Sequence, residues 1–505
     1  MKTYFEYMNE FDKDDIYESL LGYGMFSDKL PTCFSSEDFY KYCLTRTNSF
    51  NRSEYNYVVY NNIRNINIPR ELAIPNPMAY QRLCKCIADE WDLLKDYFYD
   101  CTSAQEYKVS RIHIRKLHSK KAIFEMNYSN WKLDGSIDSK LSIGMKYVVY
   151  ADIAKCFPSI YTHSISWALV GKEVAKNNRH WSRWFNKIDK ACQNVKYGET
   201  NGILIGPHTS NIISEIILCK IDKILTDEGW KYVRNIDDYQ AYVKSEEEAN
   251  QFLTKLQQAL SEYNLQLNHK KTRISKLPLA ISQSWFRKMD PIKLMDEKKE
   301  MNYKACQKYL DDTIEIASKE QDNASVYKYA FRVLKNKKLT ENARKYEQDI
   351  AFHLSLIFPY LVPLLDEFIF DVCNTSVDEK KFILNRIYNE YLPKLIYEPV
   401  IYSIYWAILY DLELVNMDVN TILQTNNSVL MLLSFIYFKK SGNNEPCLVL
   451  KNQAENLLQD KEEFEKNWIF VYEVLPADKF SDDWKALKNN DVSFLTEEMK
   501  NILNT

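Results

Sequence analysis

Glycine is scarce in this chain of 505 residues, with only 10 present, and the common glycine-rich phosphate-binding patterns do not occur. Neither G-x-x-x-x-G-K-[ST] nor G-x-G-x-x-G is found, so the sequence gives no evidence for a P-loop or a dinucleotide-binding loop. The chain also lacks an excess of basic residues, since its formal net charge at pH 7 is −3. Any contact with nucleic acid must therefore depend on a local patch of positive charge.

Paired cysteine spacings and long hydrophobic runs are missing as well. The 11 cysteines are scattered, and the close pair Cys84 and Cys86 has neither the gap nor the second pair that a zinc site needs. We interpret them as reduced thiols of a cytosolic protein. The longest uncharged apolar stretch, residues 351–365, is shorter than the roughly 20 residues that span a bilayer. It predicts a core helix, and we expect neither a membrane segment nor a secretory signal.

The pattern of apolar residues divides the chain into two parts. Residues 1–290 mix helical and strand-like patterns, whereas residues 291–505 are almost wholly helical in pattern. The charged stretch 288–299 contains Pro291 and favours a domain boundary there. The helical part has four blocks of helical spacing, at residues 326–339, 350–372, 382–414 and 422–438. Such blocks indicate packed helix pairs, as in a solenoid, although no fixed repeat length is present.

Two segments of the first part have strand character. Residues 147–150 (YVVY) form a short β-prone run that leads to Asp152, and we interpret it as a buried strand. Residues 231–243 (KYVRNIDDYQAYV) hold two β-prone runs around Asp237 and Asp238 and predict a hairpin. Adjacent strand residues point to opposite faces, so these two acids can serve one site only where the chain turns.

The three aspartates suit divalent metal ions. Phosphoryl transfer from a nucleoside triphosphate uses two ions roughly 3.5–4 Å apart, held by converging carboxylates. Asp152 ends a buried-type strand, where an unpaired carboxylate would be costly without a cation. Taken singly, each acid is more typical of a solvated loop or a helix cap. In this order and context they predict a site for two Mg²⁺ ions, with Mn²⁺ as the alternative ion.

Further motifs connect these aspartates. Residues 201–214 (NGILIGPHTSNIIS) predict a turn that leads into an apolar helix carrying Glu215, and residues 265–274 read LQLNHKKTRI. The order D-I-x-x-x-F-P-S-I-Y, N-G-x-x-x-G-P-x-x-S-x-x-x-x-E, I-D-D and L-x-L-N-x-x-K-T resembles palm motifs A, B, C and D of reverse transcriptases. The resemblance covers about residues 60–280, and residues 68–80 and 110–116 look like the fingers region.

Within this group the chain most resembles bacterial abortive-infection (Abi) reverse transcriptases of phage defence, through residues 20–34 (LLGYGMFSDKLPTCF), the fingers and the helical tail. The resemblance implies an α+β fold, with reverse-transcriptase fingers and palm over 1–290 and an all-α HEAT-like domain over 291–505. It also implies deoxynucleoside triphosphate substrates, synthesis without an added template, and DNA that grows from a tyrosine hydroxyl and stays covalently attached. Homo-oligomers in the bacterial cytoplasm are implied as well.

The resemblance assigns roles to single residues. Asp152, Asp237 and the backbone carbonyl of Ile153 would be metal ligands, with Asp238 as a more peripheral third acid. Phe157 stands where the family places an aromatic residue that excludes a 2′-hydroxyl, and a plain core phenylalanine is the alternative.

Two motif positions depart from the common pattern. Asn201 and Gly202 would lie along the incoming nucleotide, where most reverse transcriptases carry Gln-Gly. Asn235 stands where an aromatic residue commonly precedes x-D-D. Both departures touch the region that positions the nucleotide and the primer or template, so ordinary templated copying is open to doubt, whereas the metal chemistry is not.

Basic residues supply the remaining candidates. Lys271 matches the motif D lysine that can protonate the leaving pyrophosphate, with a solvated lysine or its neighbour Lys270 as alternatives. The densest basic run of the first part, residues 108–121, contains Arg111 and Arg115, which alternate with isoleucines in a strand-like pattern. We expect these two arginines to bind the triphosphate, because a guanidinium can bind phosphate oxygens in pairs, although such a run is also typical of a solvated face.

Two other functions remain open. A templated RNA-directed DNA polymerase of the retron kind would share the same palm motifs. A catalytically silent scaffold that senses a phage product is the other alternative, and the intact Asp152, Asp237 and Asp238 argue against it.

Overall fold

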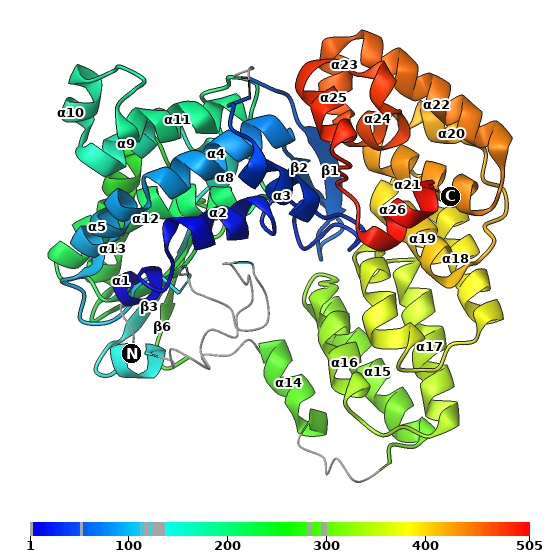
Figure 1. Ribbon diagram of the computed structural model, residues 1–505. Helices are drawn as coiled ribbons and strands as arrows, with labels where there is room; N and C mark the ends of the chain where they lie inside the picture. The colour runs from blue at the N-terminus through cyan, green and yellow to red at the C-terminus, as the bar shows by residue number, and fades with distance from the viewer. Residues whose placement is uncertain are drawn as a thin grey trace.

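The computed structural model describes residues 4–50, 54–111, 114, 122, 137–279, 284–293 and 300–504. These residues form two lobes that lie side by side, an N-terminal lobe with both β-sheets and a helical C-terminal lobe (Figure 1). The helices of the N-terminal lobe are α1 (Tyr4–Met8), α2 (Lys13–Leu21), α3 (Glu37–Thr45), α4 (Pro77–Asp89), α5 (Trp91–Thr102), α7 (Asp138–Leu141), α8 (Cys156–Ser159), α9 (His163–Val170), α10 (Lys172–Asn177), α11 (Trp184–Asn194), α12 (His208–Asp227) and α13 (Glu246–Glu262).

The strands form two antiparallel sheets. A hairpin consists of β1 (Val58–Ile63) and β2 (Pro69–Ile74), and a four-stranded sheet has the order β4-β5-β3-β6. The strands of this sheet are β3 (Tyr147–Asp152), β4 (Tyr232–Asn235), β5 (Asp238–Val243) and β6 (Arg273–Lys276). The predicted strand before Asp152 and the predicted hairpin around the paired aspartates are thus both confirmed.

The four-stranded sheet is covered by the long helices of the same lobe. Phe252 of α13 packs against the ring of Tyr232 on β4, with 5.8 Å between the ring centroids. Helix α12 packs on α13, and most of its residues are buried, because it lies in the middle of the lobe between α5, α9 and α13. Helix α13 therefore covers one face of the sheet, and α12 packs against α13.

The C-terminal lobe is helical throughout its described residues, as the sequence predicts. Its elements are α15 (Tyr303–Lys319), α16 (Ser325–Lys335), α17 (Glu341–Ser355), η2 (Pro359–Leu364), η3 (Asp366–Phe370), α18 (Val377–Tyr391), α19 (Tyr397–Tyr410), α20 (Val419–Gln424), α21 (Ser428–Lys440), α22 (Asn444–Gln459), α23 (Lys461–Lys466), α24 (Trp468–Val474), η4 (Ala477–Lys479), α25 (Asp482–Asn489) and α26 (Glu497–Asn504).

One helix prediction is wrong. Residues 351–365 do not form a single core helix, because α17 ends at Ser355 and a separate 3₁₀ helix begins at Pro359. Proline has no backbone N–H and clashes with the preceding turn, so Pro359 and Pro363 interrupt the α-helical hydrogen bonds. None of the described helices is both long and apolar enough to cross a membrane.

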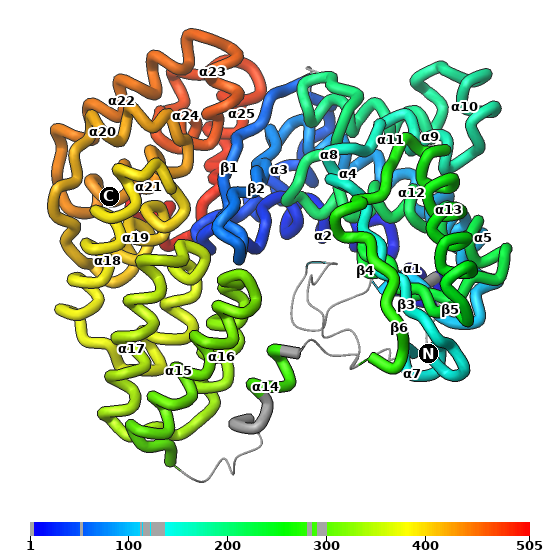
Figure 2. Tube along the Cα trace, turned by 180° about the vertical axis from the view of Figure 1, so that it is seen from behind, coloured from blue at the N-terminus to red at the C-terminus, as the bar shows by residue number. Residues whose placement is uncertain are grey.

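The predicted boundary at residue 290 falls within α14 (Ser284–Lys293). This helix contacts α15 and α16 of the C-terminal lobe. Figure 2, which shows the chain from behind, likewise places α14 beside these two helices.

The two lobes are tied together at the ends of the chain. The backbone N–H of Ser35 donates to the carbonyl of Phe494 at 3.0 Å, and that of Thr496 donates to the carbonyl of Cys33 at 2.8 Å. Arg46 forms an ion pair of 2.6 Å with Asp483 of α25. Consequently the last described residues pack on the N-terminal segment, and hairpin β1–β2 lies between the lobes (Figure 1).

Candidate active site

A cleft of about 550 Å³ opens where β3 ends and β4 turns into β5. Asp152 and Ile153 line it from the end of β3, and Ile236 and Asp237 line it from the turn. Hairpin β1–β2 also contributes to its wall, as does the start of α12. The cleft therefore brings together motif A, motif C and a part of the chain that lies about eighty residues earlier.

Asp152 is held in a fixed orientation. It is almost fully buried, and its Oδ1 accepts a hydrogen bond of 2.9 Å from Nδ2 of Asn268. Its Oδ2 forms an ion pair of 2.6 Å with Nζ of Lys271. The backbone N–H of Asn268 also donates to the carbonyl of Asp152 at 2.7 Å. Two side chains of the motif D segment thus contact the carboxylate predicted to bind metal.

The turn at residues 236–237 carries the second aspartate. Ile236 has a φ of +53°, which lies in the left-handed region that a β-branched residue rarely adopts. The carbonyl of Asp237 accepts a hydrogen bond of 3.1 Å from the N–H of Ile153. Asp238 begins β5 and pairs in register with Asp152, so both side chains lie on one face of the sheet. The left-handed backbone conformation of Ile236 is strained, and it persists only where the surrounding contacts hold it.

The turn concentrates negative charge. Burial is the main cause that raises the pKa of Asp237, and the charge of Asp152 raises it further, while Lys271 and Arg70 act in the opposite direction. Desolvation, the charge of Asp237 and a hydrogen bond to Asp152 raise the pKa of Asp238 to about 6. Desolvation and repulsion between the carboxylates both disfavour their charged forms, so an added cation would stabilise them.

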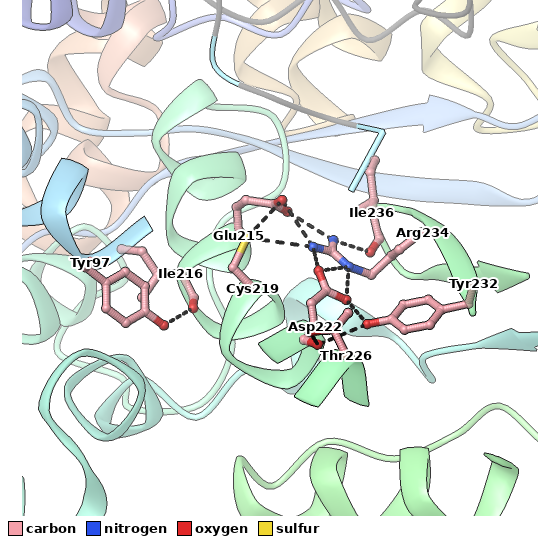
Figure 3. A network of polar contacts seen from close by, with 9 residues as sticks. All are labelled: Tyr97, Glu215, Ile216, Cys219, Asp222, Thr226, Tyr232, Arg234 and Ile236. Carbon is pink, nitrogen blue, oxygen red and sulfur yellow. Dashed lines mark hydrogen bonds and ion pairs between the residues drawn. The ribbon is translucent and has the colours of Figure 1, made fainter. Parts of the chain in front are cut away.

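A buried ion network supports the turn from behind (Figure 3). Arg234 of β4 is fully buried, and its guanidinium pairs with Asp222 at 2.5 Å and with Glu215 at 3.0 Å, both on α12. Its Nη1 also donates to the carbonyl of Ile236 at 2.9 Å. The hydroxyl of Tyr232 donates to Oδ1 of Asp222 at 2.9 Å. Spacing of seven residues places Glu215 and Asp222 on one helix face, and Arg234 connects that face to the turn.

The donor chemistry fits divalent ions such as Mg²⁺, because hard carboxylate oxygens with surplus negative charge are what such ions prefer. The geometry is not that of a finished metal site. In the part of the chain that the structure describes, no three His, Cys, Asp or Glu side chains are arranged to hold a metal ion. At Asp152, Lys271 and Asn268 contact both carboxylate oxygens.

The predicted nucleotide contacts are divided between the cleft and its surroundings. Phe157 is half-buried and lines the cleft, as a sugar-contacting residue would. Gly202 has a φ of +81° and lies against α8, where its N–H donates to the carbonyl of Ile160 at 2.7 Å. Asn201 is exposed, and its carbonyl accepts a hydrogen bond from Lys196. Neither Asn201 nor Gly202 is among the described residues that line this cleft.

Of the two arginines predicted to bind the triphosphate, the structure describes Arg111, which lies away from the cleft. The backbone N–H of Arg111 donates to the carbonyl of Arg234 at 2.8 Å, and its guanidinium is 3.9 Å from Asp138. Arg111 therefore lies at the edge of β4, outside the set of described residues that line the cleft. Arg115 lies outside the described residues.

Other cations line the cleft, and the sequence analysis did not select them. Arg64 and Arg70 come from hairpin β1–β2, Lys29 from the N-terminal segment and Lys155 from the loop after β3. Among the described residues, none of these four side chains forms an ion pair. Burial and the like charge of Arg64 lower the pKa of Arg70, while the charge of Asp237 raises it. The one sequence signal that could have found Arg70 is its position within the fingers-like stretch 68–80.

Comparison with protein families gives the class of this domain. The model described as "Reverse transcriptase (RNA-dependent DNA polymerase)" matches residues 105–303. A reverse-transcriptase domain is therefore present, and it includes Asp152, Asp237, Asp238 and Lys271. The match leaves hairpin β1–β2 and nearly all of the helical lobe outside it.

Comparison with individual proteins does not define the class of the chain any further. No curated protein matches the chain. Among solved structures, an apo telomerase from Candida tropicalis, truncated from its C-terminal domain, is similar at 13% identity with a TM-score of 0.26. The similarity covers 46% of this chain and 51% of the telomerase chain, so the match spans about half of that protein.

Proposed function

We propose that this protein is a DNA polymerase that adds deoxynucleotides by the two-metal chemistry of reverse transcriptases. The observation that carries the proposal is the meeting of Asp152 and Asp237 in one cleft that also holds five cationic side chains. Carboxylates for divalent ions and cations for a triphosphate are the two sets of groups that nucleotidyl transfer needs. The cations are Lys29, Arg64, Arg70, Lys155 and Lys271.

The residues of the cleft divide the work of this reaction. Divalent ions, when bound at the aspartates, supply charge neutralisation and activation of the attacking hydroxyl. Arg64 and Arg70 bind the triphosphate, and Phe157 lies beneath the sugar, where it excludes a 2′-hydroxyl. The attacking hydroxyl gives its proton to solvent and its oxygen bonds to the α-phosphorus as the bond to pyrophosphate breaks, and Lys271 donates a proton to the leaving oxygen.

The finer proposal follows the resemblance to abortive-infection reverse transcriptases. Synthesis proceeds without a template, the first nucleotide is added to a tyrosine hydroxyl, and the protein acts in bacterial defence against phage as a homo-oligomer. The departures at Asn201 and Asn235 support this view, because both fall where a templated enzyme positions its nucleotide and primer. The helical lobe, in place of a conventional thumb, is a HEAT-like domain in this proposal.

The decisive experiment gives the purified protein one labelled deoxynucleotide and Mg²⁺ without template or primer. Label that stays with the protein on denaturing electrophoresis is the expected result, and peptide mass spectrometry then locates the modified tyrosine. Asp237→Asn should abolish labelling. The matched control Asp227→Asn, on the exposed end of α12, should leave it intact.

The two alternatives make different forecasts for the same assay. If labelling appears only after a structured RNA is added, the retron-like templated polymerase is favoured. If neither labelling nor phage protection responds to Asp237→Asn, the silent scaffold is favoured instead. Light scattering of the purified protein tests the oligomer directly, and a monomer would contradict that part of the proposal.

A further inference from the structure

The ammonium group of Lys271 contacts an oxygen of Asp152, the carboxylate predicted to hold a divalent ion. Nζ is 2.6 Å from Oδ2, while Asn268 donates to Oδ1 at 2.9 Å, so both carboxylate oxygens have a partner. Both Asp152 and Lys271 line the same cleft, which is the route by which a cation reaches the buried carboxylate. Two cations in contact with one oxygen repel each other strongly, because the energy rises as their distance and the local dielectric constant fall. The two cations therefore compete for this oxygen.

Lys271 is able to leave, because only its ammonium is tied to Asp152. Its side chain is 58% exposed, whereas that of Asp152 is 6% exposed. Its backbone is anchored separately, with the N–H donating to the carbonyl of Asn268 at 3.0 Å. Thr272 donates to the same carbonyl through Oγ1 at 3.0 Å. A lysine on a flexible four-carbon stem can therefore swing while the loop stays in place.

We propose that Lys271 is an exchangeable cation of the active site, which holds Asp152 in the metal-free protein and gives way to the divalent ion. This inference rests on the proposed function and deepens it. The displaced ammonium stays within the cleft, which Arg64 and Arg70 also line and to which a triphosphate brings negative charge. Exchange thus couples the binding of metal to the arrival of Lys271 at the phosphates.

The neighbouring lysine provides a matched control. Lys270 is exposed, belongs to the same loop and carries the same charge, yet it is not among the described residues that line the cleft. If the loss of any positive charge near the site changed the affinity for metal, substitution of either lysine would change it. If Lys271 exchanges with the metal ion, only substitution of Lys271 should change the affinity for metal.

The experiment titrates the full chain with Mn²⁺ alone, without nucleotide, and measures free Mn²⁺ by electron paramagnetic resonance. The relevant site is the one lost in Asp152→Asn. Lys271→Met should bind Mn²⁺ about fivefold more tightly than the parent protein, as expected for removal of one half-exposed competing cation. Lys271→Arg, which keeps the charge, and Lys270→Met should both bind as the parent protein does. A non-hydrolysable deoxynucleotide should tighten Mn²⁺ binding more in the parent protein than in Lys271→Met.

Unchanged or weaker Mn²⁺ binding by Lys271→Met would overturn the exchange, and Lys271→Gln repeats the test with a polar side chain. Thermal unfolding of each variant shows that the fold is intact. The outcomes separate this inference from the proposed function. A parent protein that incorporates nucleotide while Lys271→Met binds Mn²⁺ normally refutes only the exchange. Tighter binding by Lys271→Met in a protein that never incorporates nucleotide refutes only the polymerase.

Discussion

The carboxylate of Glu398 on α19 accepts a hydrogen bond of 2.6 Å from the backbone N–H of Ile63 on β1. Nδ2 of Asn62 donates to the other oxygen at 2.7 Å, and the hydroxyl of Tyr60 donates to it at 3.3 Å. Glu398 is therefore a buried carboxylate of the helical lobe whose partners all lie on the hairpin that lines the cleft. The protonation state of Glu398 therefore affects how firmly the two lobes are joined.

Glu398 should make stability depend on pH near neutrality. Burial is the main cause that raises the pKa of Glu398 from 4.5 to about 7 in the folded protein. Because the folded state holds this proton more tightly than the unfolded state, the contribution of Glu398 to stability is greatest below about pH 4.5 and is lost as pH rises through about 7. The full loss is on the order of 3 kcal/mol.

Urea unfolding at pH 5, 6 and 8 measures this dependence. Glu398→Gln should lose less stability than the parent protein between pH 5 and 8. Glu390→Gln is the control, since pairing with Lys394 lowers the pKa of Glu390 and leaves it ionised over this range. Parallel curves for the parent protein and Glu398→Gln would contradict the assignment.

Arg70, and not Arg111, should control the affinity for nucleotide. Arg70→Ala removes a cation from the cleft wall, and a charged hydrogen bond of about 1.5–3 kcal/mol corresponds to a KM roughly 10- to 100-fold higher. Arg111→Ala should change KM less than about threefold, because its guanidinium lies at the edge of β4 near Asp138. Steady-state incorporation kinetics decide between the two residues, and the reverse order of effects would restore the sequence-based assignment.

The buried network behind the turn should be essential for stability. Arg234→Met leaves Asp222 and Glu215 buried without their cation and should lower the free energy of unfolding by about 3–5 kcal/mol. The control Lys255→Met breaks the exposed 3.0 Å pair with Glu228 and should cost less than about 1 kcal/mol. Urea unfolding compares the two variants. Equal midpoints would mean that the network contributes no more than a surface ion pair.

Gly202 should resist substitution more than another glycine with the same backbone conformation. Gly144 and Gly202 have φ values of +77° and +81°, so alanine at either position should cost about 1–2 kcal/mol through the left-handed backbone. Only at Gly202 would the added Cβ meet a backbone atom closely, at 2.9 Å from the carbonyl oxygen of Pro158. Because that contact displaces the segment after β3, Gly202→Ala should also reduce incorporation about 10- to 100-fold.

Gly144→Ala should leave incorporation unchanged, since nothing lies within 4 Å of its added Cβ. Thermal unfolding and incorporation measured on both variants separate backbone strain from the contact. Equal activity in the two variants would show that the segment at Gly202 tolerates the shift.

Local patterns were enough to predict the elements that carry the acids. The strand that ends at Asp152 and the hairpin around Asp237 follow from β-prone runs and a turn, which are properties of neighbouring residues. The helical character of the second part follows from apolar spacing in the same way. The prediction failed at residues 351–365, where two prolines outweighed the apolar content that had suggested one helix.

The order and spacing of the motifs in the sequence determined the reverse-transcriptase class of the domain and the acids on which its chemistry would depend. Only the tertiary structure decided which cations meet those acids. Arg70 comes from hairpin β1–β2, well before Asp152 in the chain, and Lys271 reaches Asp152 from 119 residues away. Contacts of this kind arise from the packing of whole elements, and no local pattern records them. The ion pair between Lys271 and Asp152 therefore exists only in the folded chain.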